Sequence, residues 1–227
     1  MADLETWAKL SRYFTERNVT LIAVSKTKPA EDILELYTGG QRDFGENYVQ
    51  ELEGKKATLP GDIRWHFIGH LQTNKVKYIA PFVFLIHGVD NLKLLLEINR
   101  QALKNERVID VLLQLYIAKE DTKFGFDKDE VMQLLTDIRS GVLHLGNIRI
   151  CGFMGMASDT PDTMVIDKEF SGLHHFLAEV KEDFFMDKPE FNICSMGMSG
   201  DYERAISAGS TMVRIGSLLF GKRNYSA

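Results

Sequence analysis

Short apolar runs, rich in β-branched residues, recur about eight times along this chain, with helical patterns between them. The runs cover residues 20–25, 42–45, 64–69, 82–90, 108–118, 148–156, 191–197 and 211–217. Most are apolar without interruption, which predicts strands buried on both faces rather than strands with one solvated face. This recurrence limits the fold to classes built from buried, largely parallel strands.

The helical patterns between these runs cover residues 30–38, 46–58, 91–105, 127–139, 163–183 and 199–208. Strands that alternate with helices form parallel βαβ units, and about eight units in 227 residues predict one closed (β/α)8 TIM barrel. The rival fold, an open doubly wound sheet, commonly carries G-x-G-x-x-G after its first strand, where this chain has AVSKTKPAED. No Pro/Ser/Gly-rich linker divides the chain, so we expect a single domain over residues 1–227.

Composition and charge exclude several classes of protein. A net charge of -5, from 27 Lys+Arg and 32 Asp+Glu, provides no long-range attraction to nucleic acid or to an anionic membrane. Charged residues interrupt the N-terminal segment, unlike a signal peptide, and no apolar run approaches the length of a membrane span. Cys151 and Cys194 lie in apolar runs and are interpreted as buried thiols. We therefore expect a soluble cytoplasmic protein that binds neither nucleic acid nor membrane.

The first strand ends on a lysine, in the stretch LIAVSKTKP. Ile22, Val24 and Lys26 share one face of this strand, and in a barrel the C-terminal ends of the strands open onto the mouth where active sites are built. Lys26 would then extend from the barrel interior into the mouth. The alternative is a solvated lysine in a βα loop, a role that suits Lys28, next to Pro29, better.

Polar residues follow the second and third strands. We expect Gly45 to end the second strand and Asn47 to begin a helix that faces the mouth, either as a helix cap or as a ligand contact. His66 and His70 are four residues apart, but strand and turn lie between them, which excludes a zinc-binding helix. His66 is interpreted as a hydrogen-bonded strand residue and His70 as a loop residue, and we expect no metal site.

Two glycine-containing turns follow the seventh and eighth strands. The segment GMSG, residues 197–200, contains Met198 and Ser199 where an apolar strand gives way to a helix, and such a turn can present backbone N–H groups to an anion. In a barrel, Gly216 and Ser217 would stand beside it, and the loops after strands seven and eight commonly bind phosphate in this fold. The alternative is a capped helix with a tight turn and no ligand.

An arginine in the last strand completes the set. Arg214 lies between Val213 and Ile215, and a charged group inside such a strand is either ion-paired or used for a ligand. Combined with Lys26 and the glycine turns, it suits pyridoxal 5'-phosphate (PLP). The lysine can form a Schiff base with the aldehyde, the turns can hold the phosphate, and the arginine can face the ring nitrogen.

The motifs AVSKTKP, FGENYVQE, WHFIGHLQTNK, GFMGM and GMSGDYERAISAGSTMVRIGSLLFG occur here in the order and spacing of a known family. In these motifs, from Leu21 to Tyr225, the chain closely resembles the pyridoxal phosphate homeostasis proteins, single-domain relatives of the N-terminal barrel of alanine racemase. The resemblance implies that Lys26 carries PLP as an aldimine, that Ser199, Gly216 and Ser217 lie near the phosphate, that Arg214 faces the ring nitrogen, and that Asn47 lines the pocket. The candidate cofactor-binding residues are Lys26, Asn47, Met198, Ser199, Arg214, Gly216 and Ser217.

The expected function is PLP homeostasis, in which a monomer holds the cofactor and passes it to PLP-dependent apo-enzymes, with no catalytic residues of its own. The alternative is a PLP-dependent amino-acid racemase. Racemisation needs a base on each face of the cofactor, and in alanine racemase a second domain of another subunit supplies a tyrosine for this. The chain ends at Ala227, so we expect no such domain and no dedicated turnover.

Overall fold

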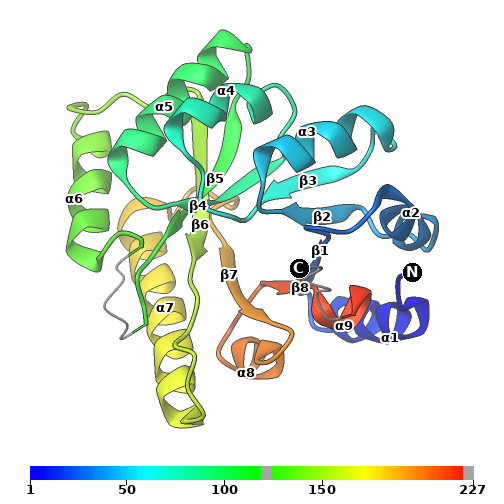
Figure 1. The fold of residues 1–227 in the computed structure, drawn as a ribbon. Coiled ribbons are helices and arrows are strands. Elements are labelled where there is room, and N and C mark those ends of the chain that lie inside the picture. Colours follow the sequence, from blue (N-terminus) through cyan, green and yellow to red (C-terminus); the bar gives the residue numbers. More distant parts are fainter. Residues whose placement is uncertain (119–123, 222–227) are drawn as a thin grey trace.

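The strands close into a barrel at the centre of the molecule (Figure 1). The computed structural model describes residues 1–118 and 124–221, and in them eight parallel strands pair in chain order from β1 to β8. The strands are β1 Thr20–Val24, β2 Asp43–Glu46, β3 Arg64–Phe67, β4 Leu85–Val89, β5 Ile109–Gln114, β6 Ile148–Met154, β7 Ile193–Met198 and β8 Met212–Ile215. Pairing of β1 with β8 closes the ring, and the predicted (β/α)8 fold is confirmed.

Helices surround this ring (Figure 1). They are α1 Leu4–Thr15, α2 Ala30–Thr38, α3 Val49–Thr58, η1 Thr73–Lys75, α4 Val76–Ile79, α5 Leu92–Lys104, α6 Lys128–Arg139, α7 Thr163–Phe184, α8 Tyr202–Ser207 and α9 Ser217–Phe220. Several predicted boundaries are wrong: β5 ends at Gln114 rather than at residue 118, and α8 begins at Tyr202 rather than at residue 199. Strand β2 continues through Glu46, so Asn47 lies in a turn and helix α3 begins only at Val49. No described helix is long and apolar enough to cross a membrane.

The strands separate two apolar layers because alternate side chains point to opposite faces. Ile22 points into the barrel, whereas its neighbour Ala23 belongs to the larger core between strands and helices. The buried apolar residues inside the barrel are Ile22, Leu85, Leu112, Cys151, Met154 and Met212. Both cysteines are buried free thiols, as predicted. The inward position of Ile22 places Val24 and Lys26 on the side of the strand that leads to the mouth.

Strands β6 and β7 approach each other closely at Gly152. This residue has φ +144°, a conformation that L side chains rarely adopt, and a Cβ atom there would come within 2.0 Å of the carbonyl oxygen of Ile193. Gly152 and Ile193 are register partners, so no rotation of the new side chain relieves the contact. A glycine is required here for the barrel to close.

We predict that Gly152→Ala lowers the free energy of unfolding by about 3 kcal/mol or more, because the methyl group forces the two strands apart. Gly172→Ala in helix α7 is the matched control, since its Cβ meets nothing within 4 Å. There the same substitution should leave stability unchanged or raise it by about 0.5–1 kcal/mol. Urea unfolding of both variants measures this, and similar stabilities for the two would contradict the prediction.

Candidate functional site

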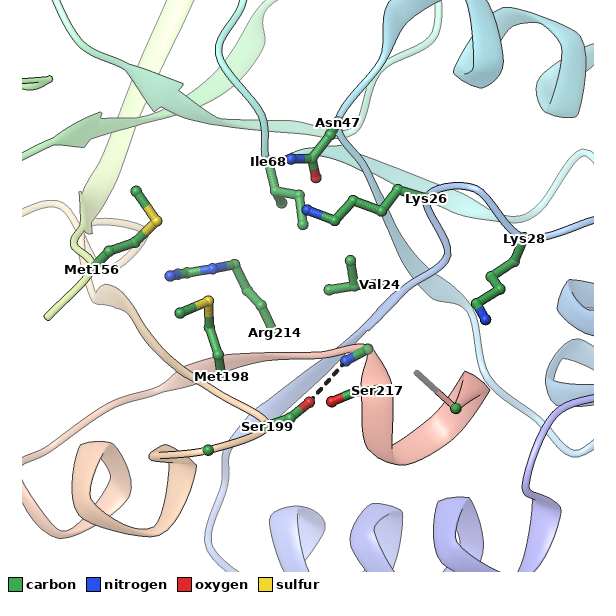
Figure 2. A pocket seen from close by; sticks show the side chains of 13 residues that line it. Val24, Lys26, Lys28, Asn47, Ile68, Met156, Met198, Ser199, Arg214 and Ser217 are labelled. Atoms are coloured by element: carbon green, nitrogen blue, oxygen red, sulfur yellow. Dashed lines mark hydrogen bonds between the residues drawn. The ribbon is translucent and has the colours of Figure 1, made fainter. Parts of the chain in front are cut away.

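A cavity of about 310 Å³ opens at the C-terminal ends of the strands (Figure 2). Its lining residues are Val24, Lys26, Lys28, Asn47, Ile68, Met156, Met198, Ser199, Gly200, Arg214, Gly216, Ser217 and Gly221. All seven residues selected from the sequence as candidates are among them. The described residues contain no group of three or more His, Cys, Asp or Glu side chains that could hold a metal ion.

Closure of the barrel brings the two ends of the chain together at this cavity. Strand β1 pairs with β8 so that Ile22 lies beside Arg214 and Ala23 beside Ile215. One position further along, Gly216 faces Val24, and a Cβ atom at Gly216 would lie 3.4 Å from the Cβ of Val24. Residues separated by about 190 positions in the sequence therefore form one wall.

The two lysines of the SKTKP motif have different surroundings. The side chain of Lys26 extends into the cavity toward Asn47 and Ile68 (Figure 2). Lys28 instead donates a hydrogen bond of 2.6 Å from Nζ to the carbonyl oxygen of Phe220, which ties the loop after β1 to helix α9. The ammonium group that points toward the middle of the cavity is that of Lys26.

The backbone beside Lys26 is strained and is held in place by hydrogen bonds. Thr27 has φ +63°, which is rare for a β-branched residue and costs of order 1–3 kcal/mol. Its N–H donates to Glu51 Oε1 at 2.6 Å, and the N–H of Lys28 donates to the carbonyl oxygen of Ser25 at 3.0 Å. These contacts hold the turn in the form that directs Lys26 inward.

A buried ion cluster supports the same turn. Lys55 Nζ donates to the carbonyl oxygen of Ser25 at 2.8 Å, to Glu46 Oε1 at 2.7 Å and to Glu51 Oε1 at 2.6 Å. Burial raises the pKa of Glu46 to about 7, although the nearby ammonium group of Lys55 acts in the opposite direction. Sequence reasoning missed this cluster, because Glu46 and Lys55 do not line the cavity and Lys55 supports the turn through the carbonyl oxygen of Ser25.

The turns after β7 and β8 are joined by a hydrogen bond. The N–H of Gly216 donates to Ser199 Oγ at 3.2 Å (Figure 2). The carboxylate of Asp201 accepts a bond of 2.6 Å from the N–H of Met198 and so closes the turn between them. The two turns place the hydroxyl groups of Ser199 and Ser217 beside Gly216. This set of donors is suited to bind an anionic oxygen group.

Arg214 is almost completely buried and hydrogen-bonded on the barrel side. One terminal nitrogen donates to the carbonyl oxygen and to Oγ of Ser195, at 2.7 and 2.8 Å, and the other donates to the carbonyl oxygen of Gly155 at 3.1 Å. Burial lowers the pKa of Arg214 to about 10, so the guanidinium remains charged at neutral pH. The predicted alternatives were an ion pair or a ligand contact. In the residues that the structure describes, Arg214 donates to neutral acceptors on its barrel side, not to an ion-pair partner, and it lines the cavity.

The cavity also contains residues that sequence reasoning did not select. Ile68 and Met156 lie just beyond the ends of β3 and β6, so the rule that strand ends line the mouth could have identified them. Asn47 was selected, and its buried Oδ1 has no hydrogen-bond partner within the described part of the chain. An unsatisfied buried acceptor in a cavity wall indicates a position for a ligand donor.

These groups can bind one kind of ligand together. A primary amine can condense with a carbonyl carbon, paired hydroxyl and N–H groups can hold an anion, and apolar side chains can cover a planar ring. The cavity therefore suits a planar molecule with an anionic group near Ser199 and a carbonyl group near Lys26.

Comparisons with known proteins agree with this geometry. The family model described as "Alanine racemase, N-terminal domain" matches residues 4–224. The pyridoxal phosphate homeostasis protein of Vibrio alginolyticus is 40% identical, with 93% of this chain and 90% of that protein covered. The protein of the same name from Aquifex aeolicus is 39% identical, with 92% and 90% covered.

Solved structures give the same result. PipY of Synechococcus elongatus is 33% identical, covers 96% of this chain and 99% of its own, and superposes with a TM-score of 0.88 without PLP and 0.84 with PLP bound. Alanine racemase from Streptomyces coelicolor A3(2), at 16% identity and a TM-score of 0.73, covers 98% of this chain but 59% of its own and shows the fold alone. The chain thus belongs to the alanine racemase N-terminal domain family and, within it, to the pyridoxal phosphate homeostasis proteins.

Proposed function

We propose that this protein binds PLP in the cavity at the barrel mouth and holds it as a Schiff base on Lys26, as part of intracellular PLP homeostasis. The observation that carries the proposal is the convergence of an inward-pointing lysine, a buried arginine and a hydroxyl-lined glycine turn in one cavity. The names of the curated relatives and the PLP-bound structure of PipY support the same cofactor.

Each wall of the cavity has a role in this proposal. When bound, PLP supplies an aldehyde that condenses with a primary amine, and Lys26 is the amine placed to receive it. Ser199, Ser217 and the backbone at Gly216 bind the phosphate, and Arg214 faces the ring nitrogen. Asn47 offers its unsatisfied carbonyl oxygen to a donor of the ligand. Met198, which is 42% exposed, covers the outer edge of the cavity.

The protein's wider role forms a second part of the proposal. We infer that the chain acts as a single-domain monomer in the cytoplasm and passes its cofactor to PLP-dependent apo-enzymes. A net charge of -5 does not favour nucleic acid or anionic membranes as partners. A Schiff base suits a protein that stores and releases PLP, because the bond sequesters the reactive aldehyde and is reversed by water.

We predict that Lys26→Ala abolishes the yellow absorbance band of PLP-loaded protein and its labelling by borohydride. Lys28→Ala is the control and should keep both signals, because Lys28 Nζ is bonded to the carbonyl oxygen of Phe220. Absorbance spectra before and after reduction, followed by peptide mass mapping, give the answer. A label on Lys28, together with a yellow Lys26→Ala protein, would show that the assignment is wrong.

The phosphate site gives a graded prediction. Ser199→Ala removes one hydroxyl donor to the phosphate while the neighbouring donors remain, and it should weaken PLP binding on the order of 10-fold. Gly216→Val fills the space against Val24 and should weaken it on the order of 100-fold. Gly54→Ala, at a helical glycine whose Cβ meets nothing within 4 Å, should bind PLP normally. Titration followed by absorbance measures all three, and equal affinities would argue against this phosphate site.

The racemase alternative has one observation in its favour, the alanine racemase family of the domain. The residues that line the cavity argue against a racemase. Its titratable side chains among the described residues are Lys26, Lys28 and Arg214, and Lys28 is engaged with the backbone of α9. Arg214 keeps its proton at neutral pH, so none of the described lining residues is placed to act as an acid opposite Lys26.

We therefore predict slow inversion of amino acids. A missing acid–base group costs about 10²–10⁴-fold in rate. PLP-loaded protein is incubated with single L- or D-amino acids in deuterated water, and both α-proton exchange and optical rotation are followed. Inversion at rates typical of enzymes, absent in Lys26→Ala, would favour the racemase instead.

A further inference from the structure

A line of hydrogen-bonded side chains runs through the barrel interior from the cavity to Asp43 at the start of β2. Arg214 donates to Ser195 Oγ at 2.8 Å, and Ser195 Oγ lies 3.0 Å from His87 Nδ1. His87 Nε2 lies 3.0 Å from His66 Nδ1, and His66 Nε2 lies 3.0 Å from Asp43 Oδ1. These five residues come from β8, β7, β4, β3 and β2, and all are buried.

Arg64 fixes the far end of this line. Its guanidinium bonds both carboxylate oxygens of Asp43, with Nε 2.6 Å from Oδ1. Burial acts to raise the pKa of Asp43, but hydrogen bonds from Arg64 and His66 outweigh it and leave the pKa lowered. Asp43 is therefore a carboxylate that can only accept hydrogen bonds.

Asp43 can only accept hydrogen bonds and Arg214 can only donate them. Each hydrogen bond between these two ends is therefore donated toward Asp43. His66 must donate from Nε2 to Asp43, so its Nδ1 accepts from Nε2 of His87. His87 Nδ1 then accepts the proton of the Ser195 hydroxyl, and a lone pair of Ser195 Oγ faces Arg214. Burial lowers the pKa of both histidines, that of His87 well below its usual value, which agrees with neutral rings.

We propose that Ser195, His87, His66 and Asp43 are positioning residues that orient Arg214 at the cavity, with all hydrogen bonds of the line donated in the direction of Asp43. The role of Arg214 as the contact of the cofactor ring rests on the proposed function, whereas the line itself is a property of this chain. Among the described residues, the guanidinium of Arg214 donates to neutral groups, Ser195 and the carbonyl oxygen of Gly155, so neutral acceptors hold it in place.

Direction matters because a guanidinium cannot accept a hydrogen bond. If the line were reversed, His87 Nδ1–H would donate to Ser195 Oγ. Ser195 Oγ would then accept from both His87 and Arg214, and the Ser195 proton would have no acceptor on the line. Reversal therefore leaves a buried hydroxyl proton without its partner on the line and weakens the support of Arg214.

Asp43→Asn tests the direction without touching the cavity. Arg64 Nε and His66 Nε2 both bond Oδ1 of Asp43, so the amide oxygen of the variant takes this position and keeps both hydrogen bonds. The acceptor that sets the direction remains although the negative charge is lost, so both rings keep their tautomer. Ring ¹⁵N shifts in NMR spectra should show His66 and His87 protonated on Nε2 in the unaltered protein and in the variant. Nδ1–H on His87 in either protein would overturn the proposal.

Ser195→Ala tests the link to Arg214. This variant should weaken PLP binding about 10-fold, because the guanidinium loses the acceptor that orients it. Ser210→Ala is the matched control: its buried hydroxyl bonds the carbonyl oxygens of Cys194, Met196 and Met212 on the same two strands, outside the line. Ser210→Ala should lose stability as Ser195→Ala does, yet bind PLP within about twofold of the unaltered protein.

The two tests also separate this proposal from the proposed function. The tautomers are measured without cofactor, so failure to bind PLP at all would refute the proposed function while the NMR result still decides the line. Normal PLP binding in Ser195→Ala, or equal weakening in both serine variants, would refute the positioning role even if Lys26 carries the cofactor. If Asp43→Asn does not fold, the tautomers of the unaltered protein and the serine pair remain decisive.

Discussion

Pairing of β1 with β8 is the interaction on which the rest of the structure depends. It joins Thr20–Ala23 to Met212–Ile215 and closes the barrel across nearly the full length of the chain. Lys26 continues from one of these strands, and Arg214 with the turn at Gly216 belongs to the other. Without this pairing the lysine, the arginine and the anion-binding turns would belong to separate parts of the chain. The cavity is a consequence of closure rather than of any local motif.

Closure also creates an interior in which apolar and polar side chains are divided. Ile22, Leu112 and Met212 are among the side chains that fill the apolar part, while the line from Arg214 to Asp43 crosses the barrel beside it. Burying a charge and two imidazoles is costly unless each group has its partner. Here the hydrogen bonds are continuous from Arg214 to Asp43, so the barrel can hold a charged group at the cavity with each polar group of the line partnered. The strained turn at Thr27, which follows the neighbouring strand β1, is held by Glu51 and Lys55.

Much of the fold could be predicted because its signals are local. Largely apolar runs marked the strands, and the helices followed from spacing and flanking residues. Helix α1 was missed although Trp7, Leu10 and Phe14 are spaced to share one helical face after the N-cap residue Asp3. Helices α4 and α9 have four residues each, too few for a periodic pattern. The start of α3 was placed too early, because Glu46 reads as a helix former but is held in β2 by its partners.

The sequence by itself determined the barrel and the inward position of Lys26, because side chains alternate along a strand and strand ends meet at the mouth. It also marked the glycine turns and the buried arginine as candidates. Only the tertiary structure decided which groups meet. His66 and His87 could be read as strand residues, but their partners lie up to 108 positions away. A hydrogen bond forms only within a few tenths of an ångström of its ideal length. The stagger and closure of the whole barrel set that separation, and no local pattern encodes it.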